Sequence, residues 1–205
     1  MPVRALMVDV DGVVVVQPDL EGWAANLERD LGVSKARVQE AFFAPHFDEV
    51  VTGRAALRDR LAPVLADIAP GVTCDDFIDY WFGNDAYLDH GLLNQIDALR
   101  AKGIRAELAT VQEHERAAYL WTTLGLKDHF DAIHYAAELG AAKPSPEFFH
   151  AVEARSGYAA ADIFFIDDKA ANIDAARALG WNAAVWDGSR TVVDLMTEAG
   201  VWPVV

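Results

Sequence analysis

The sequence predicts a doubly wound α/β fold, in which helices cover both faces of a mostly parallel sheet and a group of helices is inserted. Five apolar runs of strand length alternate with segments of helical periodicity along the 205-residue chain. These runs are apolar on both faces, which is typical of parallel strands that helices cover on each side. One long stretch after the first run has helical periodicity alone, which indicates an insertion into the α/β core.

Five segments are predicted to form the strands, and a helix is predicted before each strand from the second onward. The strands are expected at residues 3–8, 104–110, 131–135, 162–167 and 182–186, and the third has the weakest pattern. Helices are expected at residues 90–103, 112–125, 145–157 and 169–180, each ending at a glycine, which commonly stops a helix. Ser145 is the predicted N-cap of the third helix and Pro146 its first residue.

The inserted stretch is expected to form a small helical bundle over one end of the sheet. Helical periodicity covers residues 20–32, 34–44, 54–68 and 74–82, and Pro63 is expected to kink or split the third of these helices. The sequence therefore predicts an α/β catalytic core at residues 1–16 and 90–205 and a helical domain at residues 17–89.

The composition excludes several classes of protein. Hydrophobic residues make up 53% of the chain and charged residues 24%, which is typical of a packed globular protein. A net charge of −15 argues against a nucleic-acid backbone or an anionic membrane as partner. Cys74 is the one cysteine, so an internal disulfide is excluded, and no apolar window approaches the ~18 residues of a membrane span. The expected location is the cytoplasm.

Two carboxylates follow the first predicted strand. Asp9 stands at its carboxyl end, and Asp11 comes two residues later, so the two side chains can point to the same side of an extended chain. Gly12 then permits a sharp turn or a close approach of the backbone. In a parallel α/β sheet, chemistry gathers at the carboxyl ends of the strands.

Polar side chains also follow three other strands. Thr110 ends the second strand, Lys143 lies in a loop after the third, and Asp167 and Asp168 end the fourth. Together with Asp9 and Asp11 they would converge on one crevice. Such a cluster of carboxylates repels itself unless a cation is present, and an all-oxygen set suits Mg²⁺, which in turn suits a phosphate.

Each of these residues also has a purely structural interpretation. An Asp-X-Asp-Gly stretch is a common turn, Thr110 and Asp168 are suited to cap the helices that follow them, and a loop lysine such as Lys143 is usually solvated. Their joint occurrence at successive strand ends favours a functional site.

The order of these motifs resembles the haloacid dehalogenase-like (HAD) superfamily of hydrolases along essentially the whole chain. The stretch DVDGV matches the first motif of that family, LAT at residues 108–110 the second, KPSPEFF from Lys143 the third and FFIDDKAANIDAARALGW the fourth. The inserted helices resemble the small helical cap domain of the family. The resemblance therefore implies a Rossmann-like core with an α-helical cap.

The resemblance also implies roles for the acidic residues. Asp9 would be the nucleophile that forms an aspartyl-phosphate, and Asp11 the general acid and base. Mg²⁺ would be held by the Asp9 side chain, the backbone carbonyl of Asp11 and Asp168, with Asp167 close by through water. Asn172 falls near this site, where many relatives carry another acid.

Three further residues are implied to hold the phosphoryl group. Thr110 and Lys143 would contact its oxygens, and Lys143 would also offset the charge of Asp9. Relatives often have Asn after the second-motif Thr or Ser, whereas this chain has Val111, whose backbone N–H suffices for a phosphate contact.

The expected function is that of a Mg²⁺-dependent phosphatase acting on a small phosphorylated metabolite, as a monomer or a homodimer. Relatives that displace halide lack the aspartate at the Asp11 position, because a halide leaves without a proton. A phosphomutase, for example of a sugar phosphate, and a non-catalytic binding relative remain alternatives.

Overall fold

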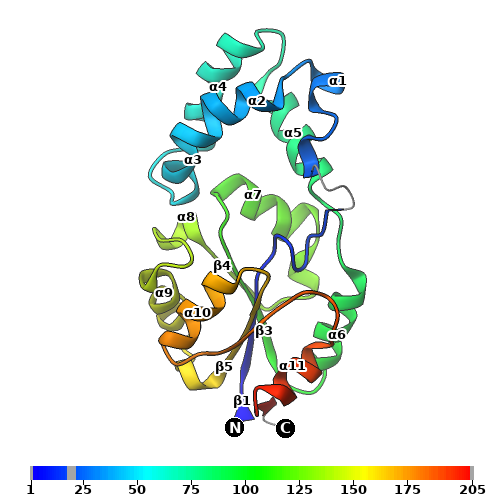
Figure 1. The fold of residues 1–205 in the computed structure, drawn as a ribbon, viewed down its shortest axis with the longest axis vertical. Coiled ribbons are helices and arrows are strands. Elements are labelled where there is room, and N and C mark those ends of the chain that lie inside the picture. The colour runs from blue at the N-terminus through cyan, green and yellow to red at the C-terminus, as the bar shows by residue number, and fades with distance from the viewer. Residues whose placement is uncertain (1, 18–21, 204–205) are drawn as a thin grey trace.

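A computed structural model describes residues 2–17 and 22–203 (Figure 1). Residues 1, 18–21 and 204–205 lie outside the described part, and they include the ends of the predicted core and the first residues of the helix expected at 20–32. Among the described residues, none of the helices combines the length and the apolar character that crossing a membrane requires.

A five-stranded parallel sheet forms the centre of the molecule, with the order β4-β3-β2-β5-β6. Its strands are β2 (Ala5–Val8), β3 (Arg105–Thr110), β4 (Ala132–Tyr135), β5 (Ile163–Asp167) and β6 (Asn182–Val185). All five predicted strands are therefore present.

The first predicted strand is divided in the structure. Residues Pro2–Val3 form β1, which pairs with β7 (Trp202–Pro203) in a separate two-stranded parallel sheet that the sequence did not predict. The division falls at Arg4, whose backbone N–H donates to the carbonyl of Asp162 at 2.8 Å.

Both faces of the main sheet are buried, which confirms the doubly wound arrangement. Along β2, Leu6 and Val8 enter one hydrophobic core, and Ala5 and Met7 enter the other. The first core is completed by α6 (His90–Arg100) and α11 (Val192–Glu198), and the second by α8 (Ala136–Leu139), α9 (Pro146–Ser156) and α10 (Ala170–Ala178). These two groups of helices lie on opposite sides of the strands in Figure 1.

Most predicted helices of the α/β part appear with shifted ends. The segment expected at 112–125 forms a short helix, α7 (His114–Ala118), that continues into a π-helical turn, η3 (Tyr119–Thr123). Ser145 occupies the N-cap position of α9 with Pro146 as its first residue, as predicted, but the Ser145 hydroxyl bonds to Glu147 and caps no backbone N–H.

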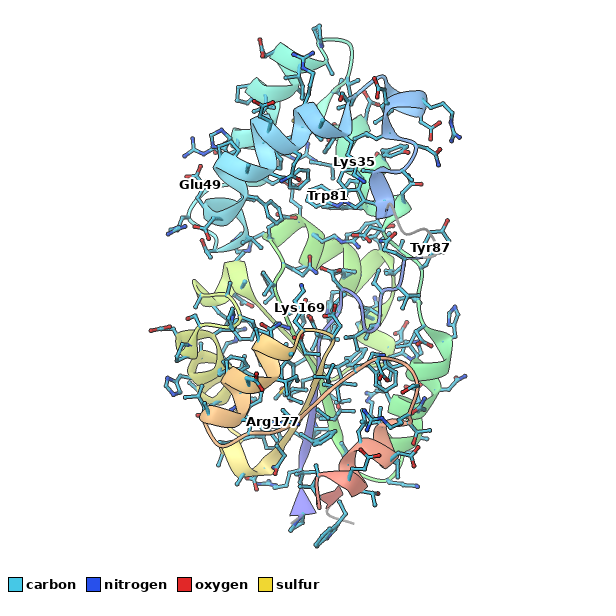
Figure 2. The ribbon with its side chains drawn as sticks, in the orientation of Figure 1. Lys35, Glu49, Trp81, Tyr87, Lys169 and Arg177 are labelled. Atoms are coloured by element: carbon cyan, nitrogen blue, oxygen red, sulfur yellow. The ribbon has the colours of Figure 1, made fainter. Side chains whose placement is uncertain are left out.

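Residues 22–84, between β2 and α6, are mostly helical and have a hydrophobic core of their own, and we call them the helical insert. It contains η1 (Gly22–Ala24), α1 (Leu27–Leu31), α2 (Lys35–Val38), η2 (Gln39–Phe43), α3 (Ala44–Val51), α4 (Leu57–Ile68) and α5 (Cys74–Asn84). Figure 2 shows Trp81 within this insert, where its ring stacks on Trp23 at 5.4 Å between centroids. Of the two effects expected of Pro63, a kink or a split, the split does not occur, because α4 runs as one helix. Pro63 lies on its exposed side, where water can reach the carbonyl that loses a partner.

Two chain segments connect the insert to the α/β core and run side by side. The N–H of Val16 donates to the carbonyl of Tyr87 at 2.8 Å, and that of Asp89 to the carbonyl of Val14 at 2.9 Å. Away from these connections the insert touches the core at Gly53, where an added Cβ would lie 2.2 Å from the carbonyl oxygen of Ala137. Figure 1 shows the insert over the end of the sheet from which α7 starts.

Candidate active site

The order of strands reverses at the centre of the sheet, next to β2. Strand β2 lies between β3 and β5, and successive strands extend the sheet outward on each side. In open α/β sheets this reversal leaves a crevice beyond the carboxyl ends of the strands. Asp9 directly follows β2, and Thr110 and Asp167 are the last residues of β3 and β5. The topology therefore brings these three predicted residues to one place.

Lys143 joins two of the predicted carboxylates. Its Nζ lies 2.9 Å from Oδ1 of Asp9 and 2.5 Å from Oδ2 of Asp167. All three side chains are almost completely buried. The loop that carries Lys143 runs from the end of α8 to the N-cap of α9, so both ends of the loop are held by helices. Lys143 is thus a structural partner of the two carboxylates and is shielded from solvent.

Asp167 has all its oxygens occupied by donors. Besides Lys143, its oxygens accept from the amide of Asn172 at 2.9 and 2.8 Å and from the N–H of Lys169 at 2.8 Å. Burial alone would raise the pKa of Asp167, but the charge and hydrogen bond of Lys143, with these other donors, outweigh it and lower the pKa. Asn172, whose part the sequence left open, therefore holds Asp167, which in turn holds Lys143.

Asp9 is less well compensated. Burial raises its pKa to about 7 against the opposing charge of Lys143, and the charges of Asp167 and Asp11 add to the rise. Its Oδ1 accepts from Lys143 and from the N–H of Val10 at 2.7 Å. One ammonium therefore faces two buried carboxylates, and a further positive charge would favour the ionised form of Asp9.

The acidic group fits a metal ion. One oxygen from each of Asp9, Asp167 and Asp168 lies within 4.8 Å of the others. Burial raises the pKa of Asp168 as well, against the charge of Lys169, and Figure 2 shows Lys169 at the end of the core that faces the insert. Because all donors are oxygens and the group carries excess negative charge, this cluster could bind a divalent cation such as Mg²⁺.

Gly12 allows the first loop to approach Asp168. Its φ is +80°, and an added Cβ would lie 2.6 Å from Oδ2 of Asp168. The backbone conformation therefore favours glycine at this position, and a larger residue would displace the carboxylate of Asp168. The close approach predicted for Gly12 is confirmed, and its neighbour proves to be the predicted metal ligand Asp168.

Asp11 contacts a residue that the sequence did not single out. Nε2 of Gln112 donates to Oδ2 of Asp11 at 2.8 Å, and Oδ1 of Asp11 is buried without a hydrogen-bond partner in the described part of the chain. Thr110 is fully buried, and its hydroxyl lies 3.4 Å from Nε2 of Gln112. Val111 packs against the hydrophobic core that α9 and α10 complete. In the sequence, only its position just beyond a predicted strand end could have marked Gln112 as a residue of this site.

A buried ion pair that the sequence also missed lies where the insert joins the core. Arg116 of α7 is 2% exposed, and its guanidinium contacts the carboxylate of Asp85 at 3.2 Å and the carbonyl of Phe82 at 3.1 Å. Burial raises the pKa of Asp85 to about 6 against the charge of Arg116, and the charge of Asp11 adds to the rise. Arg116 therefore fixes the segment after α5 to the core, within electrostatic reach of Asp11.

Comparison with known proteins identifies a family and related folds. The family model for haloacid dehalogenase-like hydrolases matches residues 3–180. A HAD family enzyme from Bacteroides thetaiotaomicron, solved in complex with magnesium and inorganic phosphate, is 20% identical with a TM-score of 0.78, and the match covers 94% of this chain and 98% of that one. A predicted HAD-like family hydrolase from Porphyromonas gingivalis is 22% identical with a TM-score of 0.75, covering 97% and 98%. L-2-haloacid dehalogenase from Xanthobacter autotrophicus is 19% identical with a TM-score of 0.63, covering 96% and 81%. At these identities the three structures share the fold.

Proposed function

This chain belongs to the haloacid dehalogenase-like hydrolase family, and from that premise we propose that it is a Mg²⁺-dependent phosphatase. Its substrate would be a phosphate monoester of a small metabolite. The observation that carries the proposal is the second aspartate, Asp11, two residues beyond Asp9 and held in the crevice by Gln112. A halide leaves carbon without a proton, whereas an alkoxide leaving phosphorus needs one, so the second carboxyl favours phosphoryl chemistry.

The first half of the proposed reaction uses Asp9 as nucleophile. A carboxylate oxygen of Asp9 attacks phosphorus, the bond from phosphorus to the ester oxygen breaks, and the electron pair of that bond goes to the leaving oxygen. Asp11 gives its proton to that oxygen, so the products are an aspartyl-phosphate on Asp9, a free alcohol and an ionised Asp11. In the second half, Asp11 takes a proton from water, which attacks phosphorus and releases phosphate with regeneration of Asp9.

The other residues of the crevice would hold the phosphoryl group and the metal. Lys143, the Thr110 hydroxyl and the N–H of Val111 would contact the phosphoryl oxygens, and Lys143 would also offset the charge of Asp9. The Asp9 side chain, the Asp11 carbonyl and Asp168 would hold Mg²⁺. When bound, Mg²⁺ supplies positive charge that keeps Asp9 ionised and stabilises charge developing on the phosphoryl oxygens.

We further propose that residues 17–89 form a cap domain that closes over the substrate and excludes water, with 1–16 and 90–205 as the catalytic core. The separate hydrophobic core of the insert and the paired connecting segments support a body that moves as a unit. Specificity for the small metabolite would then lie in the cap.

The test is a screen of phosphate monoesters with Mg²⁺ and with a chelator, which reads released inorganic phosphate. We expect Mg²⁺-dependent turnover that Asp9→Asn abolishes. Asp59→Asn, the same change at an exposed position of α4, should leave turnover unchanged. Turnover that survives Asp9→Asn would refute the mechanism, and halide release from 2-haloacids without ester hydrolysis would refute the phosphatase. Isomerised hexose phosphate without released phosphate would indicate a phosphomutase.

A further inference from the structure

Gln112 is held on both sides by the fold. It lies two residues beyond Thr110, the end of β3, and directly before Glu113, whose carboxylate caps the first turn of α7 by accepting from the N–H groups of Glu115 and Arg116. The backbone carbonyl of Gln112 accepts from the N–H of Ala137 at 3.1 Å, at the start of α8. Because its backbone is fixed and its side chain is nearly buried, Gln112 presents its amide to the crevice in a preorganised position.

The amide of Gln112 distinguishes the two oxygens of Asp11. Its Nε2 donates to Oδ2 at 2.8 Å, while Oδ1 is buried and finds no hydrogen-bond partner within residues 2–17 and 22–203. An amide N–H can only donate, so Oδ2 must accept in either protonation state of Asp11. In a protonated carboxyl group the carbonyl oxygen is the better acceptor, and the proton therefore resides on the other oxygen, Oδ1.

We propose that Gln112 is a positioning residue for Asp11, which fixes the carboxyl group and directs its transferable proton to Oδ1, the buried oxygen that has no hydrogen-bond partner among the described residues. This inference rests on the proposed phosphatase function and deepens it. Within the described part of the chain, the Gln112 side chain bonds to Asp11 and Thr110 and to none of the side chains proposed to hold Mg²⁺. The proton leaves Oδ1 as the bond between phosphorus and the ester oxygen breaks, and the amide keeps its bond to Oδ2 throughout.

A positioning role for the proton donor predicts a dependence on the leaving group. An alkoxide is strongly basic and must be protonated as it leaves, whereas 2,4-dinitrophenolate is stable as an anion and leaves without a proton. Loss of Gln112 should therefore impair hydrolysis of alkyl phosphates and spare dinitrophenyl phosphate. A merely structural role would impair both substrates equally.

The experiment compares kcat/KM of the full-length enzyme at saturating Mg²⁺ for an alkyl phosphate and for 2,4-dinitrophenyl phosphate. This constant reports the steps up to formation of the aspartyl-phosphate, in which the leaving group departs. Gln112→Met keeps the length of the side chain without its donor, and Gln112→Glu places an acceptor against Oδ2. For both variants we expect a loss of about 30-fold on the alkyl ester and less than about threefold on the dinitrophenyl ester. Gln39→Met, the same change at an exposed position of the insert, should affect neither.

The outcomes separate the inference from the function on which it rests. Equal losses on both esters, or no loss on either, overturn the role of Gln112. The role of Gln112 is also overturned if Mg²⁺ raises the Tm of the wild type but not that of a Gln112 variant. The loss of activity would then follow from a loss of Mg²⁺ binding. A wild type that hydrolyses neither ester overturns the proposed function, and the inference falls with it.

Discussion

Lys143 and Asp9 form an ion pair of 2.9 Å between Nζ and Oδ1, and both side chains are almost inaccessible to solvent. The same ammonium holds Asp167 at 2.5 Å. A buried charge without a partner is costly, so this lysine affects the stability of the core as well as the charge of the proposed nucleophile.

Replacing Lys143 with methionine should lower both stability and activity. The change leaves the buried carboxylates of Asp9 and Asp167 without their shared cation, so we expect the free energy of unfolding of the metal-free protein to fall by about 3 kcal/mol. Urea denaturation measures this, and turnover of a phosphate ester should drop at least about 100-fold. Lys127→Met, at an exposed position, should change neither, and unchanged stability of Lys143→Met would contradict the buried pair.

Gly12→Ala should disturb the proposed metal site specifically. At φ +80° alanine is strained, and its Cβ would meet Oδ2 of Asp168 at 2.6 Å. We expect a loss of about 1 kcal/mol in stability together with weaker Mg²⁺ binding, measured by calorimetry. Gly32→Ala is the matched control, because its φ is +69° and nothing lies within 4 Å of the added Cβ. Gly32→Ala should lose similar stability and keep its Mg²⁺ affinity. If the two variants bind Mg²⁺ equally well, the contact between Gly12 and Asp168 does not affect the proposed metal site.

Arg58 of the insert and Glu115 of α7 should contribute to closure of the insert over the core. Their side chains meet at 2.9 Å between Nε and Oε2, away from the connecting segments. Because the pair is largely exposed, we expect Arg58→Met and Glu115→Gln each to raise KM only about threefold, with no further rise in the double variant. High salt should reduce the difference from the wild type. The control is Arg29→Met, which removes two hydrogen bonds to the adjacent Asp30. Additive effects of Arg58→Met and Glu115→Gln would show that the two side chains do not interact.

Asp131 should stabilise the protein in a pH-dependent way. Burial would raise its pKa, but hydrogen bonds from Arg100 and from the N–H of Ala106, with the charges of Arg100 and Arg105, outweigh it and lower the pKa. A carboxyl whose pKa is lower in the folded state stabilises the fold above its unfolded pKa of about 3.9, and this contribution is lost as the pH falls through the folded value.

Asp131→Asn should therefore lower the free energy of unfolding by about 1–2 kcal/mol at pH 7. The difference from the wild type should shrink as the pH falls from about 3.9 through the lower pKa of the folded state, where the wild-type carboxyl also loses its charge. Urea titrations of both proteins at several pH values measure it. A difference that stays constant down to acidic pH would show that the charge of Asp131 contributes nothing.

The strands and the strand-end residues could be predicted because both depend on local pattern. Apolar runs identified all five strands of the main sheet, and a parallel sheet brings the residues at its carboxyl edge together. Asp9 and Asp167 do lie around Lys143 as this reasoning expects. The catalytic and metal-binding roles of these residues stay predictions until the experiments above are done.

The contact between Gln112 and Asp11 could not be predicted in the same way. The two residues are 101 positions apart, and nothing in the neighbourhood of a glutamine in the sequence shows which carboxylate its amide will reach. Arg116 similarly resembles the exposed arginine of a short helix, yet the segment after α5 covers it and supplies Asp85 as partner. The pairing of β1 with β7 also joins the two ends of the described chain.

The sequence by itself determined the parallel α/β core, the helical nature of the insert and the set of polar residues at the strand ends. Periodicity and turn residues suffice for these features, because they follow from hydrogen bonding and burial over a few neighbouring residues. Only the tertiary structure decided that Asn172 holds Asp167, that Gly12 lies against Asp168 and that Gln112 selects one oxygen of Asp11. These contacts depend on how distant segments pack, because a buried polar group takes whichever partner the completed fold places within reach.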